Sequence, residues 1–180
     1  MTATHPVWTG DAWIELPVPT SAGEPVVVTI VNALVYDSSL RNRILLQRRD
    51  KPAEVVRGRL ELPGGRWRAG MAPDVEVVRE VAEETGVKVV AVSAALERLE
   101  HEAHITTVAA RPLAVVAGID GAFPSVHVLF ECYGEGEPRP VPGEVADPKW
   151  WEVEEVCDLL ASDPDAFVWQ TTAMLRAVFG

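Results

Sequence analysis

One segment near the middle of the chain has clearly marked helical boundaries. Its sequence, PDVEVVREVAEET, runs from Pro73 to Thr85, and its apolar residues follow the i, i+3, i+7 spacing of one helix stripe. These apolar positions are Val75, Val78 and Ala82. Proline is accepted in a first helical turn, and Gly86 stands where a helix end favours a left-handed residue. The sequence therefore predicts an α-helix over residues 73–85.

Segments rich in β-branched residues flank this helix on both sides. Bounded by turn-forming residues, such segments are typical of strands. The predicted strands cover residues 26–36, 43–48, 60–62, 87–94, 126–133 and 150–153. Pro63, Gly64 and Gly65 are expected to stop the third of these strands. Residues 105–119 add one or two strands, broken near Arg111-Pro112.

The end of the chain changes from loop to helix. Residues 134–148 are rich in Gly, Pro and Glu and predict a loop, whereas 154–161 and 164–179 predict two helices. Strands, one helix, more strands and final helices together indicate a mixed α/β fold of the α+β type, with helices packed on a mixed sheet.

The length of 180 residues suits one domain. Residues 1–24 contain scattered Pro and Gly and predict an irregular N-terminal arm, in which Trp8 and Trp13 favour a short packed hairpin. Residues 25–180 are then expected to form the single domain. Cys132 and Cys157 are too few for a disulfide framework and are expected to be reduced core thiols.

The charge balance narrows the classes of partner. With 27 acidic and 16 basic side chains, the net charge of −11 disfavours nucleic-acid polymers and anionic membranes. A small phosphorylated ligand stays compatible if cations bridge it to the carboxylates. The first ten residues lack a signal-peptide pattern and no apolar run reaches membrane-spanning length, so a cytoplasmic enzyme is expected.

The predicted central helix gathers four glutamates, at positions 76, 80, 83 and 84. Like charges three or four residues apart repel by a few tenths of a kcal/mol per pair. Divalent metal is one reason to keep them together, because Mg²⁺ and Mn²⁺ prefer carboxylate oxygens and retain waters and substrate phosphates. The ordinary alternative is a solvated acidic face with Arg79 paired to Glu83.

The spacing around these glutamates resembles the Nudix box. Gly65 is followed after thirteen residues by Arg79, and the run from Arg79 to Val87 reads REVAEETGV. The Glu61–Gly65 segment, ELPGG, also resembles the residues that precede the box in this family, and the order of the flanking strands and helices extends the resemblance to residues 26–180.

The resemblance implies a Nudix-like α/β/α sandwich and a metal-dependent hydrolase. Such an enzyme cleaves a diphosphate linkage in a nucleoside diphosphate derivative, namely a nucleotide sugar, a dinucleotide or a nucleoside triphosphate. The resemblance further implies that Mg²⁺ or Mn²⁺ is held by the backbone carbonyl of Gly65 and by Glu80, Glu83 and Glu84. Arg79 would orient these carboxylates through salt bridges.

The chain departs from the box at Met71, where the family has a glutamate. A thioether is soft and uncharged and cannot replace a carboxylate on Mg²⁺. We hypothesise that Glu76, one turn before Glu80, supplies part of the missing charge. In many relatives a flexible loop supplies the general base, which here predicts Glu144; Glu80 itself and two neighbouring acids are alternatives. These neighbours are Glu137 and Asp147.

Arginine and tryptophan side chains around the box are candidates for substrate binding. A guanidinium can donate two parallel hydrogen bonds to a phosphate, which Arg48, Arg49, Arg57 and Arg59 could provide. Trp67 could stack on a base, or instead pack beneath its loop. His101 and His104 have an H-x-x-H spacing, which without further ligands indicates surface histidines more than a zinc site.

Two further functions fit the same scaffold. Because Met71 breaks the box, the chain could be a catalytically weak module that binds a nucleotide or sugar diphosphate as a sensor, although the intact glutamates argue against this. An isomerase would need an extra cysteine and glutamate pair, which the sequence does not offer. Residues 101–124 exceed a minimal family core, and this segment or the N-terminal arm is expected to shape the pocket or a homodimer interface.

Overall fold

The computed structural model describes residues 4–8, 13–17, 27–52, 54–68, 70–93, 96–102, 106–119, 124–140 and 145–180. Its central sheet contains β3 (Val28–Tyr36), β4 (Arg43–Arg49), β5 (Leu60–Glu61), β6 (Gly64–Arg66), β7 (Lys88–Val92), β10 (Ala114–Gly118), β11 (Ser125–Glu135) and β12 (Val145–Glu152). Its helices are α1 (Pro73–Thr85), α2 (Val153–Ser162) and α3 (Trp169–Phe179), with a 3₁₀ turn at Pro164–Ala166. Two further strand pairs are β1 (Thr4–Trp8) with β2 (Trp13–Pro17) and β8 (Leu96–Glu100) with β9 (Thr106–Ala110).

The central sheet is mixed, as the sequence predicts. Its main path runs β10-β11-β3-β4-β12, while β5, β6 and β7 pair with β4, β3 and β11. The β3–β11 pair is parallel and the other pairs are antiparallel. Strand β5 ends at Glu61, before Pro63, as the sequence predicts, but Gly64 and Gly65 then begin a separate strand, β6, whose backbone pairs with Asn32 and Val31.

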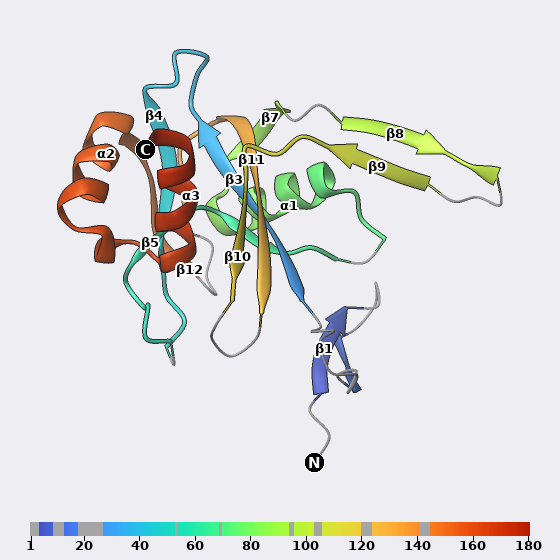
Figure 1. Cartoon of the computed structure of the whole chain (residues 1–180). Coiled ribbons are helices and arrows are strands. Elements are labelled where there is room, and N and C mark those ends of the chain that lie inside the picture. The colour runs from blue at the N-terminus through green and yellow to red at the C-terminus, as the bar shows by residue number, and fades with distance from the viewer. Residues whose placement is uncertain are drawn as a thin grey trace.

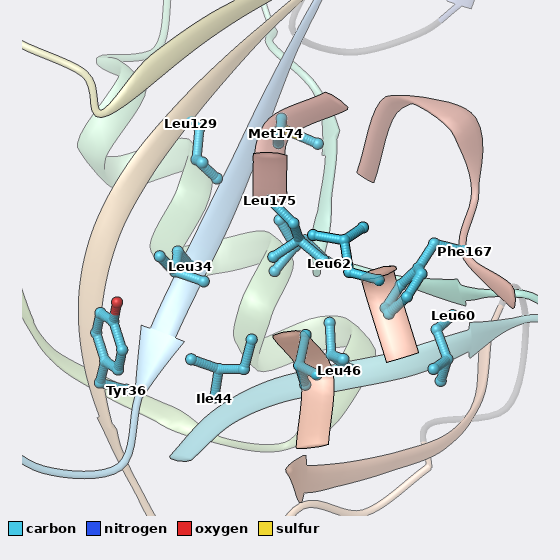
Figure 2. Packing of buried hydrophobic residues seen from close by; sticks show 12 residues of the cluster. Leu34, Tyr36, Ile44, Leu46, Leu60, Leu62, Leu129, Phe167, Met174 and Leu175 are labelled. Carbon is cyan, nitrogen blue, oxygen red and sulfur yellow. The ribbon is translucent and has the colours of Figure 1, made fainter. Parts of the chain in front are cut away.

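Helices cover both faces of this sheet, so the predicted sandwich is confirmed (Figure 1). On the α1 face, Val77 and Val81 pack with β-strand residues that include Val31, Ala33 and Leu45. On the opposite face, a larger core joins the sheet to α2 and α3. Figure 2 shows Leu34, Ile44, Leu46, Leu62, Phe167 and Leu175 converging there. Alternation along β3 and β4 sends successive side chains to the two cores, which is why these strands read as continuous apolar runs.

Helix α1 has the predicted bounds, but its buried face differs from the predicted stripe. Val75 and Ala82 are exposed, whereas Val77 and Val81 are fully buried. The helix is therefore rotated so that an i, i+4 pair of valines meets the sheet. Gly86 takes the left-handed conformation with φ of 69° and donates its N–H to Ala82 as the C-cap.

The C-terminal part of the chain differs from the sequence prediction in two places. Strand β12 begins at Val145, inside the segment expected to be a loop, because its backbone pairs with Arg49 at the end of β4. The segment 164–179 is not one helix. Phe167 is extended and fully buried, and Val168 N–H donates to the carbonyl of Leu60 at 2.8 Å, which separates the 3₁₀ turn from α3.

The remaining segments agree in part with the sequence. The region 105–119 forms β9 and β10, interrupted at Arg111-Pro112 as expected, and β9 pairs with β8 in a hairpin that projects from the sheet (Figure 1). Cys132 and Cys157 are both free. Among the described residues, no helix combines the length and apolar character needed to cross a membrane.

Candidate active site

The carboxylate of Glu80 lies directly against the backbone of Gly65. A Cβ atom at position 65 would stand 2.4 Å from the Glu80 carboxyl carbon, so no larger residue fits there without displacing the glutamate. Helix α1 brings Glu80 to this position, and the pairing of Gly65 with Val31 fixes the other side of the contact. Burial raises the pKa of Glu80, although the neighbouring Arg79 acts in the opposite direction.

Glu84, one turn further along α1, is held by two neutral donors. Its Oε2 accepts hydrogen bonds from Gln47 Nε2 at 2.7 Å and from the Gly64 N–H at 3.0 Å. The pKa of Glu84 is raised to about 8. Burial is the main cause and the charges of Glu61 and Glu80 add to it, while the two hydrogen bonds act in the opposite direction. The carboxylate is thus desolvated and placed among other carboxylates.

Glu61 comes to the same cluster from the sheet. It pairs with Gln47 across β4 and β5, and directly opposite residues place their side chains on one face. Its Oε2 lies 3.5 Å from Arg49 Nη1, and the same arginine is bonded to Glu54. Burial raises the pKa of Glu61 to about 7, against the lowering effect of Arg49.

Arg79 lies among the carboxylates of its own helix. Its guanidinium forms ion pairs with Glu76, Glu80 and Glu83. Burial lowers the pKa of Arg79, but hydrogen bonds to Glu76 and Glu83 outweigh it, so that the net pKa is raised. Glu76 is completely buried, and its Oε1 also lies 3.5 Å from Arg68 Nε. Two arginines are therefore paired with the carboxylate that we hypothesise to compensate for Met71.

The donors in this cluster fit Mg²⁺ or Mn²⁺ chemically. Glu80 and Glu84 offer hard carboxylate oxygens beside the Gly64–Gly65 backbone, and buried Oε1 atoms of Gln47 and Glu61 have no hydrogen-bond partner in the described part of the chain. Glu83 instead turns to Arg79 with 58% of its side chain exposed. Within the described ranges, no group of three or more Asp, Glu, His or Cys side chains lies close enough together to hold a metal ion in this conformation.

This geometry joins the box glycines to the carboxylates of α1, and residues 28–170 match the sequence family described as the NUDIX domain. The chain belongs to the Nudix family. No curated protein sequence matches it significantly.

Solved structures of Nudix proteins share this fold. A MutT Nudix hydrolase from Burkholderia pseudomallei is 24% identical with a TM-score of 0.60, over 85% of this chain and 98% of that one. The MutT protein from Methanosarcina mazei Go1 is 19% identical with a TM-score of 0.62, over 88% and 96%. The Nudix domain of Shewanella oneidensis NrtR, solved with ADP ribose, is 17% identical with a TM-score of 0.62, over 88% and 90%.

The candidate substrate residues of this Nudix domain do not all reach the box. Arg49 lies in the cluster, but side-chain alternation directs Arg48 to the other face of β4, where it bonds the Gly58 carbonyl. Arg59 is placed over the Trp169 ring and near Asp165, away from the glutamates. Arg57 pairs with Asp50.

The loop after the box glycines holds Trp67 and Met71 together. Trp67 is partly exposed, and its Nε1 donates to the Met71 carbonyl at 2.8 Å. His101 bonds Thr107, whereas its predicted neighbour His104 lies outside the described residues.

The candidate general base, Glu144, also lies outside the described residues. The next residue, Val145, pairs with Arg49 beside the cluster. Of the alternatives, Glu137 lines a cavity of about 300 Å³ with Asp37, Arg43 and Trp150. Asp147 lies 3.6 Å from Arg48 Nε.

Sequence reasoning missed two members of the cluster, Gln47 and Glu61. Gln47 faces α1 in the row that contains Leu45, and its polarity within an otherwise apolar strand was a usable signal. Glu61 was seen only as part of the ELPGG motif. Its proximity to Gln47 depends on β4–β5 pairing, which neither residue shows on its own.

Proposed function

We propose that this chain is a divalent metal-dependent hydrolase of the Nudix family. Its substrate would be a nucleoside diphosphate derivative with a diphosphate linkage, such as a nucleotide sugar, a dinucleotide or a nucleoside triphosphate. The observation that carries the proposal is the packing of Glu80 and Glu84 against Gly64–Gly65. Carboxylates desolvated in this way cost free energy unless a cation balances them.

The metal would be held by Glu80, Glu84 and the Gly65 carbonyl, with Glu83 joining after release from Arg79. When bound, Mg²⁺ or Mn²⁺ supplies neutralisation of phosphate oxygens and a lowered pKa of bound water. Gln47 and the Gly64 N–H fix one oxygen of Glu84, and Arg79 fixes Glu80, so the two carboxylates are oriented before a ligand arrives.

The remaining roles follow from position. Arg49, which lies beside Glu61 in the cluster, is proposed to hydrogen bond a phosphate oxygen. Trp67, partly exposed beside the box, is proposed to stack on a base. Glu144 is proposed as the general base because the strand that follows it begins beside Arg49; Glu80 stays the alternative.

Small phosphorylated substrates suit this acidic chain better than polymers. The NrtR domain, which has the same fold, was solved with ADP ribose, so an ADP-ribose-type compound belongs in the test panel. Met71, which stands where the family has glutamate, supports the second candidate function, a sensor that binds such a ligand without turning it over.

Turnover assays test the proposal. Wild-type protein should release phosphate or nucleoside monophosphate from at least one dinucleotide, nucleotide sugar or triphosphate with Mg²⁺ or Mn²⁺. Glu84→Gln should lower kcat by about 100-fold because it removes a ligand charge, while retaining the shape of the site. The matched control is Glu155→Gln on the exposed face of α2, which should keep full activity. Measurable binding without turnover of any compound would favour the sensor and reject the hydrolase.

A further inference from the structure

The Nudix box of this chain lacks one carboxylate, and the structure provides another from outside the box. Met71 stands where the family has glutamate, and its side chain is partly exposed. Glu76 is paired with Arg79 and Arg68 through one oxygen only, while its Oε2 is buried without a hydrogen-bond partner among the described residues, so its compensation for Met71 stays a prediction. Glu61, on β5, stands opposite Gln47, whose side chain donates a hydrogen bond to Glu84.

Strand pairing determines where Glu61 lies. Gln47 and Glu61 are directly opposite each other on β4 and β5, and the Gln47 amide donates to Glu84. The Gln47 side chain therefore neighbours both carboxylates, that of Glu61 and that of Glu84. Glu61 is only 8% exposed and Gln47 is fully buried, so both side chains are removed from solvent.

The two oxygens of Glu61 have different surroundings. Oε2 lies 3.5 Å from the Arg49 guanidinium, whereas Oε1 is buried and has no hydrogen-bond partner among the described residues. The Oε1 of Gln47 is likewise buried and unpartnered within that part of the chain. Buried oxygens are normally satisfied, so two in one cluster indicate a missing electropositive group.

The charges agree with this reading. Arg79 is shared by three glutamates of α1, and Arg49 is shared by Glu54 and Glu61. In the described ranges, the hydrogen-bond donors to Glu84 are neutral. A divalent cation beside Glu61 and Glu84 would balance both carboxylates.

We propose that Glu61 is a ligand of the divalent metal and takes the place of the carboxylate that Met71 lacks. The inference rests on the metal site of the proposed function and extends it to a residue outside the box. A carboxylate on β5 would approach the ion from the sheet, while Glu80 and Glu84 approach it from α1. The alternative is that Glu61 serves only to anchor Arg49.

Binding of Mn²⁺ alone, without substrate, separates these alternatives. Mn²⁺ is titrated into the wild-type chain and into the variants Glu61→Gln, Glu84→Gln and Glu54→Gln, and the free ion is followed by electron paramagnetic resonance. Glu61→Gln is expected to raise the Kd by about tenfold, as is Glu84→Gln. Glu54→Gln is the matched control, because it removes the other carboxylate bonded to Arg49 and should leave the Kd unchanged.

Thermal unfolding gives a second readout that also reports folding. Without metal, Glu61→Gln should melt at or above the wild-type temperature, because it relieves repulsion with Glu84, and its gain in Tm on adding Mn²⁺ should be smaller. A wild-type Kd in Glu61→Gln, or an equal loss in Glu54→Gln, would overturn the inference but leave the proposed hydrolase intact. Absence of Mn²⁺ binding by the wild type would overturn both.

Discussion

Glu84 shows how a single residue can be costly to the fold and useful to the site. Its carboxylate is buried and is hydrogen bonded by Gln47 and Gly64, neither of which carries charge. Neutral donors orient a carboxylate but balance only part of the desolvation cost. In the proposed hydrolase, a bound cation would balance the rest of this cost.

The raised pKa values of Glu61 and Glu84 should lower the stability of the metal-free protein as pH rises from about 4.3 to about 8, and above about pH 7 this loss comes mainly from Glu84. Burial raises the pKa of Glu84 to about 8 and that of Glu61 to about 7, whereas unfolded glutamate titrates near pH ~4.3. The folded state then holds protons that the unfolded state has already lost, so the free energy of unfolding falls with pH. Each unit by which folding raises a pKa lowers the free energy of unfolding by at most about 1.4 kcal/mol.

Urea denaturation in EDTA at several pH values measures how steeply the free energy of unfolding falls with pH. His127 does not obscure it, because burial lowers its pKa to about 4 and above about pH 7 the ring is largely neutral in both states. Glu84→Gln should flatten the dependence. An equal slope in the wild type and in Glu84→Gln would show that Glu84 is ionised in the metal-free fold.

At the scale of elements, the placement of α1 is what builds the site. Val77 and Val81 bury one side of the helix, and the adjoining side carries Glu80 and Glu84 toward β6. The helix must stop sharply for β7 to return to the sheet beside β11. Gly86 provides that stop.

Replacing Gly86 tests the helix end. An alanine Cβ would meet Arg139 Cβ at 3.7 Å, an ordinary contact, so the cost comes from φ of 69° and not from crowding. Gly86→Ala should lower the free energy of unfolding by about 1 kcal/mol. Gly86→Asn should cost less, because asparagine tolerates the left-handed region. Chemical denaturation with no difference between alanine and wild type would contradict this account.

At the scale of the whole molecule, one sheet supports two separate cores. The core under α2 and α3 contains no member of the glutamate cluster, whereas the α1 core adjoins it. A division of this kind lets one face provide stability while the edge of the other carries the polar site. Outside both cores, the surface of β10 and the residue after it remains apolar, with Val115 and Ile119 exposed.

We expect this surface to take part in a homodimer. Exposed apolar residues on an edge strand favour association with another chain, and within the described residues β10 pairs only with β11. Light scattering should give the mass of two chains, and Val115→Lys should shift it toward one. A wild-type protein that is monomeric at all concentrations tested would remove the expectation.

The sequence alone determined the features that depend on neighbours along the chain. The bounds of α1 follow from Pro73 and Gly86, the main strands follow from β-branched runs, and the family follows from fixed spacings between Gly65 and Val87. Each of these signals is local, so it survives without knowledge of the fold.

Only the tertiary structure decided which side chains meet. Val77 and Val81, not the predicted stripe, are buried because the sheet selects the face of α1. Gln47 and Glu61 join Glu84 because β4 pairs with β5, while Arg59 is drawn to Trp169 by the packing of α3. Contacts between residues far apart in sequence depend on strand register and helix rotation, and no local pattern encodes either.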